Sequence, residues 1–420
     1  MRIAVFHNLP SGGAKRTLRE QIRGLTRRGH EAEVFTLSSA EHDFADLRPH
    51  ARSHRVLPFR PMPRLASPLG RLNQALRIVD LWRLRRIHRT LARAVERTAC
   101  DMVLVHPCRY ENCPSLVAEL RRLPVVFYCH EPLRAVYEDA PRRPYDAEHL
   151  RRRRVLDRID PLPRACRGAL QHRDRRNVRR AGRVLVNSEF TRENVRRAYG
   201  VEARVSYPGV DTQWFRPLGT TRDRILLSVG SLTPLKGFDF LIAAVSRIRQ
   251  DRRPPLVVAA NFENAPERRF LERLAAESNV DARFLTGIDE ESLLEQYNRA
   301  AMLVYAPVRE PFGLVPLEAM ACELPVVAVR EGGVSESVLH ERTGLLVERE
   351  PDRFAEAIQS LLDDQARASE YGRNGRRYVE DHWTWERAVE ALEGYMRDFL
   401  QQHARVAVGH SRALATGLRD

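Results

Sequence analysis

Two carboxylates stand eight positions apart in the segment EPFGLVPLE, at Glu310 and Glu318. The apolar run AMLVYAP (301–307) before them indicates a buried strand, and the segment after them indicates a helix. Pro311 stiffens the loop between the two, and Gly313 lets backbone N–H groups approach a ligand closely. Free N–H groups at a helix start bind anions. One loop therefore offers amide donors for phosphate and carboxylate acceptors for hydroxyl groups, and a nucleotide sugar presents both.

The lysines of the chain are further candidates for phosphate chemistry. Of the 70 Lys and Arg residues only Lys15 and Lys236 are lysines, and both lie beside glycines in expected strand-to-helix loops. A lysine ammonium is a compact point charge suited to phosphate, whereas the arginine guanidinium is planar and larger. We therefore expect Lys236, which closes GSLTPLKG, to bind phosphate. For Lys15, after SGGA, the alternative is that genomic base composition favours arginine and that the remaining lysine carries no role.

These side chains must be positioned by elements that the apolar pattern predicts. Short apolar runs recur in both halves of the chain and are separated mostly by amphipathic helical stretches. The expected strands lie at 3–8, 31–37, 101–107, 124–130, 183–188 and 203–209, and then at 224–231, 255–261, 282–287, 302–307, 325–331 and 343–348. Such strands alternating with helices indicate two doubly wound α/β domains with parallel sheets. Ligands of these sheets bind beyond the carboxyl ends of the strands, which makes the cleft between the domains the expected site.

The composition excludes several other classes of protein. With 420 residues, 43% of them hydrophobic and 30% charged, the chain is expected to be globular rather than disordered. No apolar run approaches the roughly 18 residues of a membrane-spanning helix, and the opening MRIAVFHN indicates a strand, not a signal peptide. The irregular spacing of the six cysteines indicates reduced thiols in a cytosol. His106, Cys108 and Cys113 lack the spacing of a zinc knuckle, so we expect no metal site there.

The segment EPFGLVPLE resembles the E-x7-E motif of retaining glycosyltransferases of the GT4 type, also called glycosyl transferase group 1. The resemblance implies that Glu310 hydrogen-bonds the donor sugar and that Glu318 holds the ribose hydroxyls. The N–H groups of Phe312, Gly313 and Leu314 would then face the sugar and the diphosphate. It also implies the GT-B fold, in which two doubly wound Rossmann-like domains of the α/β class face each other across a cleft.

Three more segments resemble the same family. The loop with Gly12 and Gly13 matches one that lies beside the donor phosphates and the acceptor, although a tight turn that starts a helix explains it equally. His130 in CHEPLR matches a histidine that contacts the donor sugar near the reacting centre, with a structural histidine as the alternative. In TGIDEESLLEQYNRA, the backbone near Ile288 would contact the base.

The segment GSLTPLKG departs from the family pattern. It resembles the diphosphate clamp G-R-L-x-x-x-K-G, but Ser231 occupies the position of the arginine. A hydroxyl supplies no charge, so Lys236 and the amides after Gly313 must neutralise the leaving diphosphate, or another arginine must reach in. The chain also lacks a D-x-D motif, with which many nucleotide-sugar enzymes hold a divalent metal, so we expect a metal-independent site. The resemblance thus implies His130, Glu310 and Lys236 as catalytic residues, and Gly12, Gly13, Ser231, Ile288, Phe312, Gly313, Leu314 and Glu318 as donor-binding residues.

The expected domains follow from the resemblance and from a turn-rich link at 207–221. Residues 1–207 form the acceptor-side domain and residues 208–385 the donor-side domain. The GT-B pattern implies that a helix at 386–400 returns to brace the first domain. The basic segment 401–420, low in pattern, is expected to be a mobile tail.

The function that the resemblance implies is retaining transfer of a sugar, hexosyltransferase-like, from a UDP- or GDP-linked donor. The acceptor would be a lipid-linked, glycan or small-molecule hydroxyl, as in the synthesis of cell envelope polysaccharide, and no further cofactor is expected. Three alternatives remain open: a nucleotide-sugar epimerase of the same fold, a catalytically idle protein that binds sugar nucleotides, and a nucleic-acid binder.

The formal charge of +15 points to a polyanionic partner. No nucleic-acid-binding signature accompanies it, so we expect no nucleic acid and favour an anionic membrane surface, which attracts basic segments. The arginine-rich segment 141–180 and an amphipathic stretch at 71–97 are the candidate patches. A core helix whose arginines face water explains the second stretch equally. The expected location is cytoplasmic, with peripheral binding to the inner face of the membrane.

Overall fold

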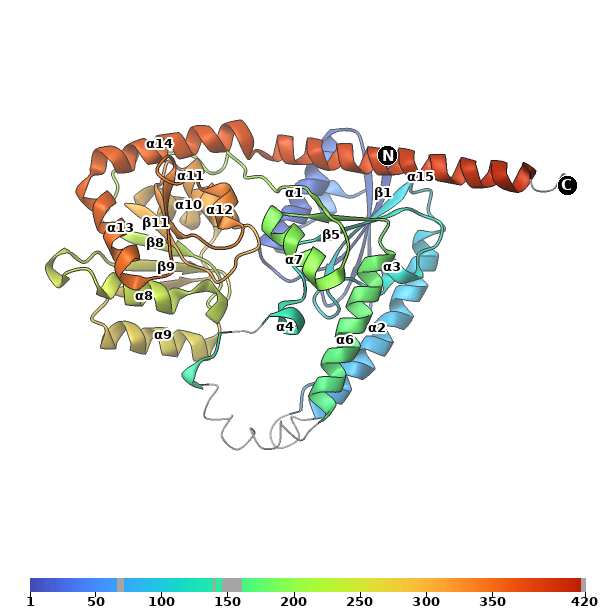
Figure 1. Ribbon diagram of the computed structural model, residues 1–420, viewed down its shortest axis with the longest axis horizontal. Helices are drawn as coiled ribbons and strands as arrows, with labels where there is room; N and C mark the ends of the chain where they lie inside the picture. Colours follow the sequence, from blue (N-terminus) through green and yellow to red (C-terminus); the bar gives the residue numbers. More distant parts are fainter. Residues whose placement is uncertain (66–71, 139–140, 146–160, 417–420) are drawn as a thin grey trace.

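The computed structural model describes residues 1–65, 72–138, 141–145 and 161–416, and within these ranges the strands form two parallel sheets (Figure 1). The first sheet has the order β3-β2-β1-β4-β5-β6-β7, from β1 (Arg2–Asn8), β2 (Glu31–Leu37), β3 (Ser53–Leu57), β4 (Met102–Cys108), β5 (Val125–Cys129), β6 (Arg183–Val186) and β7 (Arg204–Val205). The second has the order β10-β9-β8-β11-β12-β13, from β8 (Leu226–Val229), β9 (Leu256–Ala260), β10 (Ala282–Thr286), β11 (Met302–Tyr305), β12 (Val326–Val329) and β13 (Gly344–Val347). The expected α/β fold of two doubly wound domains is confirmed.

Helices cover both faces of the first sheet because alternate side chains of its strands are apolar on both sides. Phe6, Val105 and Phe127 pack toward α2 (Asn73–Val95), α3 (Leu116–Glu119), α6 (Pro161–Arg180) and α7 (Glu189–Tyr199). Val5 and Leu104 pack toward α1 (Gly13–Arg27) and α15 (Trp385–Thr416) on the other face. A short helix, α4 (Arg134–Tyr137), follows β5.

The second sheet is covered in the same way. On one face lie α8 (Phe238–Ser246), α9 (Ala265–Glu277) and α13 (Pro351–Asp363). On the other lie α10 (Glu290–Arg299), α11 (Leu314–Ala321), α12 (Val334–Ser337) and α14 (Gln365–His382). The loops after β8, β10 and β11 thus leave the sheet at one edge, on the side of the first domain.

The last helix returns to the first domain, as the GT-B pattern implied (Figure 1). Val389 of α15 packs so closely on Gly24 of α1 that a Cβ atom there would lie 2.5 Å from Val389. Phe399 fills the space beside Gly182 in the same manner. The mobile tail expected from residue 401 is helical as far as Thr416, as the end of α15, and residues 417–420 lie outside the described part of the chain.

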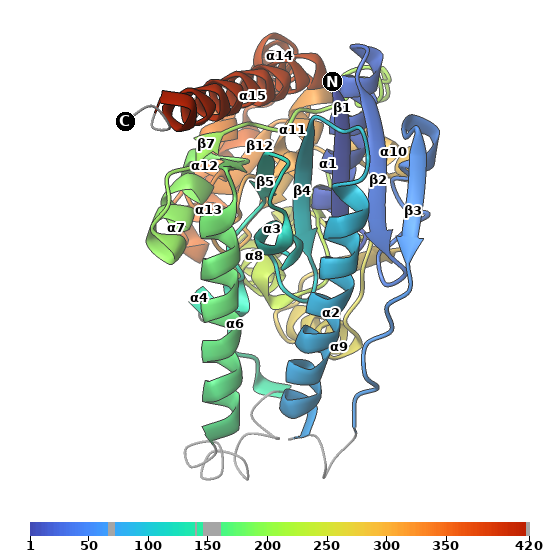
Figure 2. The same ribbon diagram turned by 90° about the vertical axis from the view of Figure 1, so that its right-hand side faces the viewer.

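Two features of the first domain differ from the sequence expectation. β3 was not predicted, because its residues are mostly polar and only partly buried at the sheet edge. The apolar side chains of the stretch 71–97 do not share one side: Leu91 and Val95 are buried in the core, whereas Val79 and Trp82 are exposed. The helix α2 itself runs beside α6 along one face of the first sheet (Figure 2). Residues 146–160 of the basic segment lie outside the described residues. None of the helices that the structure describes has both the length and the apolar composition to cross a bilayer.

Candidate active site

Lys236 and Glu310 form an ion pair at the edge of the second sheet that faces the first domain. Lys236 ends a 3-10 turn (Pro234–Lys236) after β8, and Glu310 lies in the loop between β11 and α11. The Nζ atom of Lys236 donates to both carboxylate oxygens of Glu310, at 2.8 and 2.9 Å. Burial disfavours the charged carboxylate, but the adjacent ammonium outweighs it and holds the pKa of Glu310 below its usual value. From the sequence, Lys236 was expected to bind phosphate and Glu310 to bind the donor sugar. In the structure the two residues also bind each other.

Close packing of glycines fixes the backbone around this pair. Gly237 and Gly332 have positive φ angles of 67° and 62°, a conformation that side chains disfavour. A Cβ atom at Gly332 would lie 2.4 Å from the carbonyl oxygen of Glu310, and one at Gly237 would lie 2.0 Å from that of Ala306. The N–H of Gly333 donates to the same carbonyl of Glu310 at 2.8 Å. The turn at Gly332 and Gly333 therefore clamps the loop that carries Glu310.

Glu318 is buried in α11 and is held from both domains. Its Oε2 accepts from the hydroxyl of Tyr297 at 2.7 Å, and its Oε1 accepts from Arg16 of the first domain at 2.6 Å. Arg16 also contacts Glu290 at 3.2 Å. Burial raises the pKa of Tyr305 well above its usual range, and the charges of Glu310 and Glu318 add to that rise.

The amides expected to face phosphate begin α11. Gly313 precedes the helix with a φ of 90°, and Leu314 is its first residue. Phe312 is buried against Trp383, with ring centroids 5.3 Å apart, which holds the loop in place. A Cβ atom at Gly13 would lie 3.6 Å from the Leu314 side chain. The loop of the first domain that contains Gly12 and Gly13 therefore meets the start of α11.

His130 follows β5 and is half-buried. Burial lowers its pKa to about 3, so the imidazole is neutral at ordinary pH. Its Nε2 lies 3.2 Å from Nδ1 of His106, a residue buried in β4. Glu131, the next residue, pairs with Arg134 at 2.6 Å.

Arg134 reaches across to the loop that carries Glu310. Its Nη1 donates to the carbonyl oxygen of Val308 at 3.0 Å and its Nη2 to that of Arg309. Burial raises the pKa of the Glu310 carboxyl, and the charge of Arg134 acts together with Lys236 to lower it. Sequence reasoning gave Arg134 no role, although it required another arginine in case Ser231 left the clamp without charge.

The structure does not bring every predicted residue to the ion pair. Ser231 and Ile288 lie after β8 and β10 at the same sheet edge, but among the described residues neither side chain bonds to Lys236, Glu310 or Glu318. Lys15 is buried at 1% exposure with its Nζ 3.4 Å from His7. Lys15 thus lies inside the first domain and not beside Glu310.

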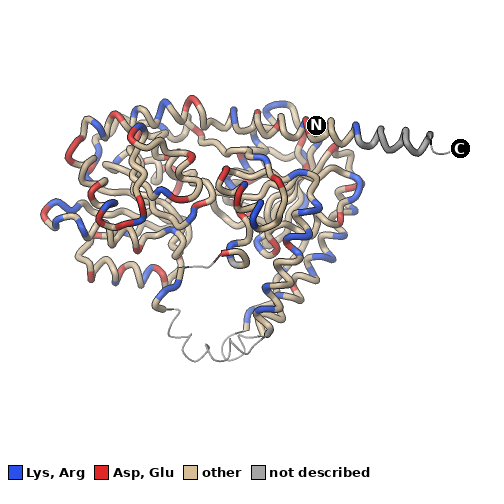
Figure 3. Tube along the Cα trace, viewed as in Figure 1, with Lys and Arg blue, Asp and Glu red and all other residues tan. Residues whose placement is uncertain are grey.

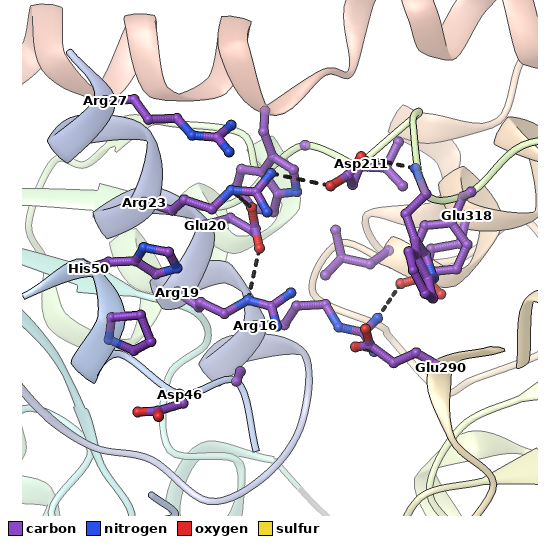
Figure 4. Close-up of a pocket in the computed structure, with 18 of the residues that line it drawn as sticks. Arg16, Arg19, Glu20, Arg23, Arg27, Asp46, His50, Asp211, Glu290 and Glu318 are labelled. Atoms are coloured by element: carbon purple, nitrogen blue, oxygen red, sulfur yellow. Dashed lines mark hydrogen bonds and ion pairs between the residues drawn. The ribbon is translucent and has the colours of Figure 1, made fainter. Parts of the chain in front are cut away.

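A cavity of about 580 Å³ lies between the domains and reaches Glu318 (Figure 4). Arg16 of α1 points across it toward Glu290 and Glu318 of the second domain, and Arg23 points toward Asp211 of the link. Its charged lining residues include Arg16, Arg19, Arg23, Arg27, Asp211, Glu290 and Glu318. Of the described residues, Lys236, Glu310 and His130 do not line this cavity, so it adjoins the ion pair rather than containing it.

Further contacts join the domains around the site. The Ser188 hydroxyl, which caps α7, also donates to the carbonyl oxygen of Pro311. Glu336 of α12 accepts from the backbone N–H groups of Glu189 and Phe190 at 2.8 and 2.9 Å, at the start of α7. Glu336 therefore connects the two domains.

The arrangement combines an ammonium, a paired carboxylate, a helix start and a neutral histidine at facing sheet edges. Such a set stabilises negative charge on a bound group and accepts hydrogen bonds from hydroxyls. Within the part of the chain that the structure describes, no group of three or more His, Cys, Asp and Glu side chains is arranged to hold a metal ion. All six cysteines are buried and free.

Two family models match the chain. The model described as Glycosyltransferase Family 4 matches residues 11–214, and the model described as Glycosyl transferases group 1 matches residues 210–378. Between them they include the Gly12 loop, His130, Lys236, Glu310 and Glu318.

Curated relatives are similar over part of their length. The chain is 35% identical over 217 residues to D-inositol 3-phosphate glycosyltransferase 2 of Catenulispora acidiphila, which covers 46% of this chain and 51% of the relative. It is 34% identical over 239 residues to GDP-mannose-dependent alpha-(1-6)-phosphatidylinositol monomannoside mannosyltransferase of Mycolicibacterium smegmatis, which covers 50% of this chain and 62% of the relative. The matched part thus spans between half and two thirds of these relatives.

Solved structures share the whole fold. Sucrose-phosphate synthase from Thermosynechococcus elongatus superimposes with a TM-score of 0.73 at 23% identity, covering 96% of this chain and 100% of that one. Anabaena HepE in complex with UDP and glucose gives a TM-score of 0.66 at 18% identity, covering 94% and 99%.

Proposed function

The chain belongs to the group 1, family 4 glycosyltransferases with the GT-B fold, and from this premise we propose that it transfers a sugar from a nucleotide-diphosphate sugar to a hydroxyl acceptor. The observation that carries the proposal is the ion pair of Lys236 and Glu310 beside the start of α11. Departure of a nucleoside diphosphate places negative charge where this ammonium and these amides converge. Preorganised charge stabilisation of this kind is usually the largest catalytic effect.

Different residues of this chain bind the leaving group and the sugar. Lys236 and the N–H groups at Gly313 and Leu314 bind the diphosphate, and Arg134 adds positive charge in place of the arginine that Ser231 lacks. Glu310 accepts from sugar hydroxyls and Glu318 from the ribose hydroxyls. With no D-x-D motif in the sequence, these groups replace a divalent metal, and turnover is expected to persist in EDTA.

We infer retention of configuration at the anomeric carbon. Both oxygens of Glu310 are engaged by Lys236, which favours a holding role over attack on the sugar. The leaving phosphate itself can take the acceptor proton on the face from which it departs. His130, neutral because burial lowers its pKa, then serves as a hydrogen-bonding contact to the sugar.

The donor is inferred to be UDP- or GDP-linked and the acceptor a lipid-linked, glycan or small-molecule hydroxyl. Two relatives support this range, since their names specify GDP-mannose, phosphatidylinositol monomannoside and inositol 3-phosphate. The base and ribose would occupy the end of the interdomain cavity that Glu318 lines.

The test is release of nucleotide from a panel of UDP-, GDP- and ADP-sugars, with inositol-containing, glycan and lipid-linked acceptors. We expect Glu310→Gln, Lys236→Ala and His130→Ala each to lower kcat/KM, the first two by about 10²-fold or more, while circular dichroism stays unchanged. Isomerised donor without an acceptor would identify an epimerase. Donor binding in calorimetry without turnover on any acceptor would identify an idle binding protein, and unchanged kinetics in all three variants would remove the site assignment.

We also propose that the first domain binds an anionic membrane surface through α2. Val79 and Trp82 are exposed on its outer face at 45% and 62%, and Arg86, Arg89 and Arg93 continue that face along the helix. Arginine positions are also frequent along the neighbouring helix α6 (Figure 3). A helix with exposed apolar and basic side chains lies at a membrane interface, which would bring a cytoplasmic enzyme to a lipid-linked acceptor.

Sedimentation with vesicles tests this surface. The protein is expected to bind vesicles that contain phosphatidylglycerol and not vesicles of phosphatidylcholine alone. Trp82→Ser should weaken binding several-fold, whereas Phe262→Ser, which removes an aromatic side chain 55% exposed on the second domain, should not. Equal binding by both variants would place the membrane contact elsewhere.

A further inference from the structure

A pair of histidines connects the interior of the first domain to the proposed site. His106 lies near the end of β4 and His130 follows β5, the neighbouring strand. The ring of His106 is stacked on Tyr128, with centroids 5.2 Å apart and an angle of 12° between planes. The Tyr128 hydroxyl donates to the carbonyl oxygen of Ser206 at 2.6 Å, which fixes that ring in turn. His106 is therefore held rigidly, with Nδ1 3.2 Å from Nε2 of His130.

The contact requires one ring to donate and the other to accept. Burial lowers the pKa of His106 well below its usual value and that of His130 to about 3, so both imidazoles are neutral and each carries one proton. The Nε2 atom of His106 is buried and has no hydrogen-bond partner among the described residues. A proton there would leave a buried N–H without an acceptor, which is rarer in proteins than an acceptor without a donor. The proton of His106 therefore belongs on Nδ1, where it meets His130.

We propose that His106 is a positioning residue whose Nδ1–H donates to Nε2 of His130 and thereby fixes His130 as the Nδ1–H tautomer, a hydrogen-bond donor to an oxygen of the sugar. The inference rests on the proposed contact between His130 and the donor sugar. The Nδ1 atom of His130 has no hydrogen-bond partner in the described part of the chain, so its N–H remains available to a ligand. The lone pair on Nε2 is already engaged, so His130 cannot take the acceptor proton through that atom.

Nitrogen NMR of the full chain labelled with 15N-histidine tests the tautomer directly. We expect Nε2 of His130 to resonate as an unprotonated nitrogen and its Nδ1 as a protonated one, with Nδ1 of His106 also protonated. The signals among the 14 histidines are assigned by their loss in His106→Leu and His130→Leu. A proton on Nε2 of His130 in the unmodified protein would overturn the proposal without any variant.

Two substitutions at His106 separate its hydrogen bond from its bulk. The side-chain amide of asparagine places an N–H close to the position of Nδ1, whereas leucine has no donor. His106→Asn should keep the Nδ1–H tautomer of His130, and His106→Leu should give a mixture of both. His88→Leu is the matched control, because His88 is also fully buried but packs edge-on against Phe6, on the other face of the sheet. If the leucine variant at His106 kept the tautomer unchanged, the proposal would fail.

The kinetic consequence separates this proposal from the proposed function. His106→Leu should lower kcat/KM for the donor about threefold to tenfold, the loss expected for one hydrogen bond, and His106→Asn should recover most of it. Equal losses in both variants would indicate a packing role alone and would count against the proposal. The NMR result does not depend on turnover, so the correct tautomer in a protein that transfers no sugar would refute the function and leave the His106 contact intact. The opposite tautomer in an active enzyme would refute the contact alone.

Discussion

At the scale of single residues, the ion pair of Lys236 and Glu310 decides whether the site can hold charge. Their side chains are only 22% and 17% exposed, so each charge depends on the other for compensation. A bound diphosphate would compete for the same ammonium, which has three N–H groups and can serve both partners. The pair therefore prepares the site for an anion while keeping the carboxylate ionised.

This dependence predicts a specific pattern of stability. Lys236→Met leaves a largely buried carboxylate without its counter-charge and should lower the free energy of unfolding by about 2 kcal/mol. Adding Glu310→Gln removes the stranded charge, so the double variant should be more stable than Lys236→Met alone. Urea denaturation of both variants checks the difference. If the loss of stability in the double variant equalled the sum of the losses in Lys236→Met and in Glu310→Gln, the two side chains would not be energetically coupled.

Asp174 offers a separate test through pH. It is 1% exposed, and burial raises its pKa to about 7, above the value near 3.9 in an unfolded chain. Between about pH 4 and 7 the folded protein keeps a proton that the unfolded chain has lost, so this residue lowers the free energy of unfolding as pH rises, by about 4 kcal/mol in total. Asp174→Asn cannot titrate, and its stability relative to the unmodified protein should therefore improve by that amount from pH 4 to 7. The difference in free energy of unfolding between Asp174→Asn and the unmodified protein is measured by urea denaturation. If that difference did not change with pH, the raised pKa of Asp174 would be contradicted.

The residues of the site were predictable only where a local pattern marks them. Glu310, Glu318 and Lys236 occupy a short motif and a glycine-rich loop, so a sequence pattern marks them as candidates, and the structure places Lys236 beside Glu310. Arg16 and Arg134 contact carboxylate and carbonyl groups far away in the chain. In a chain where all but two of the 70 basic residues are arginines, no spacing singles out these two.

At the scale of elements, the loop that carries Glu310 depends on its neighbour, the turn at Gly332. Gly332→Ala must accommodate both the positive φ and a Cβ atom 2.4 Å from the carbonyl oxygen of Glu310. We expect a loss of stability of about 3 kcal/mol and, because Glu310 shifts, a fall in kcat of tenfold or more.

A matched substitution isolates the contribution of packing. Gly219 also has a positive φ, of 69°, but a Cβ atom there would have no neighbour within 4 Å. Gly219→Ala should therefore cost only the backbone strain of about 1 kcal/mol and leave kcat unchanged. Equal effects of the two substitutions, in thermal unfolding and donor turnover, would mean that the close contact with Glu310 carries no function.

Elements were predictable where both faces of a strand are apolar, as in the sheet centres. The strand β3 was not predicted, because an edge strand needs little apolar burial and its residues contain no hydrophobic run. The end of α15 was not predicted either, because residues after 400 continue the helix although no apolar stripe in the sequence marks them. α2 shows a third case, since periodicity cannot distinguish side chains that face the core from those that face outward.

At the scale of the whole molecule, two chain segments cross between the domains side by side. The N–H of Val210 donates to the carbonyl oxygen of Trp383 at 2.8 Å, and Val210 also pairs with Thr384 in an isolated bridge. Other contacts between the domains in the described part of the chain, such as those of Arg16 with Glu318 and of Arg134 with the carbonyl oxygen of Val308, are made by side chains. We therefore expect closure to be an equilibrium that those contacts bias.

Arg143 makes a further set of contacts between the domains. The chain passes from α4 of the first domain to α6 of the same domain, and between them Arg143 binds Asp239 of α8 at 2.8 Å and Glu267 of α9 at 2.9 Å, both in the second domain. Glu267 is fully buried, so it depends on this guanidinium for its counter-charge. The segment thus ties the two domains together opposite the crossing at Val210.

Arg143→Ala should shift the molecule toward an open form. Loss of about 1.4 kcal/mol from the closed state alone raises the open-to-closed ratio tenfold. Small-angle scattering should then show a larger radius of gyration. Because the proposed donor site includes groups of both domains, such as the Gly13 loop and Glu318, we expect the apparent Kd for UDP or GDP to rise. Arg268→Ala is the control, since Arg268 lies on the same helix α9 but pairs with Glu263 and Glu272 of its own domain. A radius of gyration unchanged by Arg143→Ala, or changed equally by Arg268→Ala, would show that the tie does not govern closure.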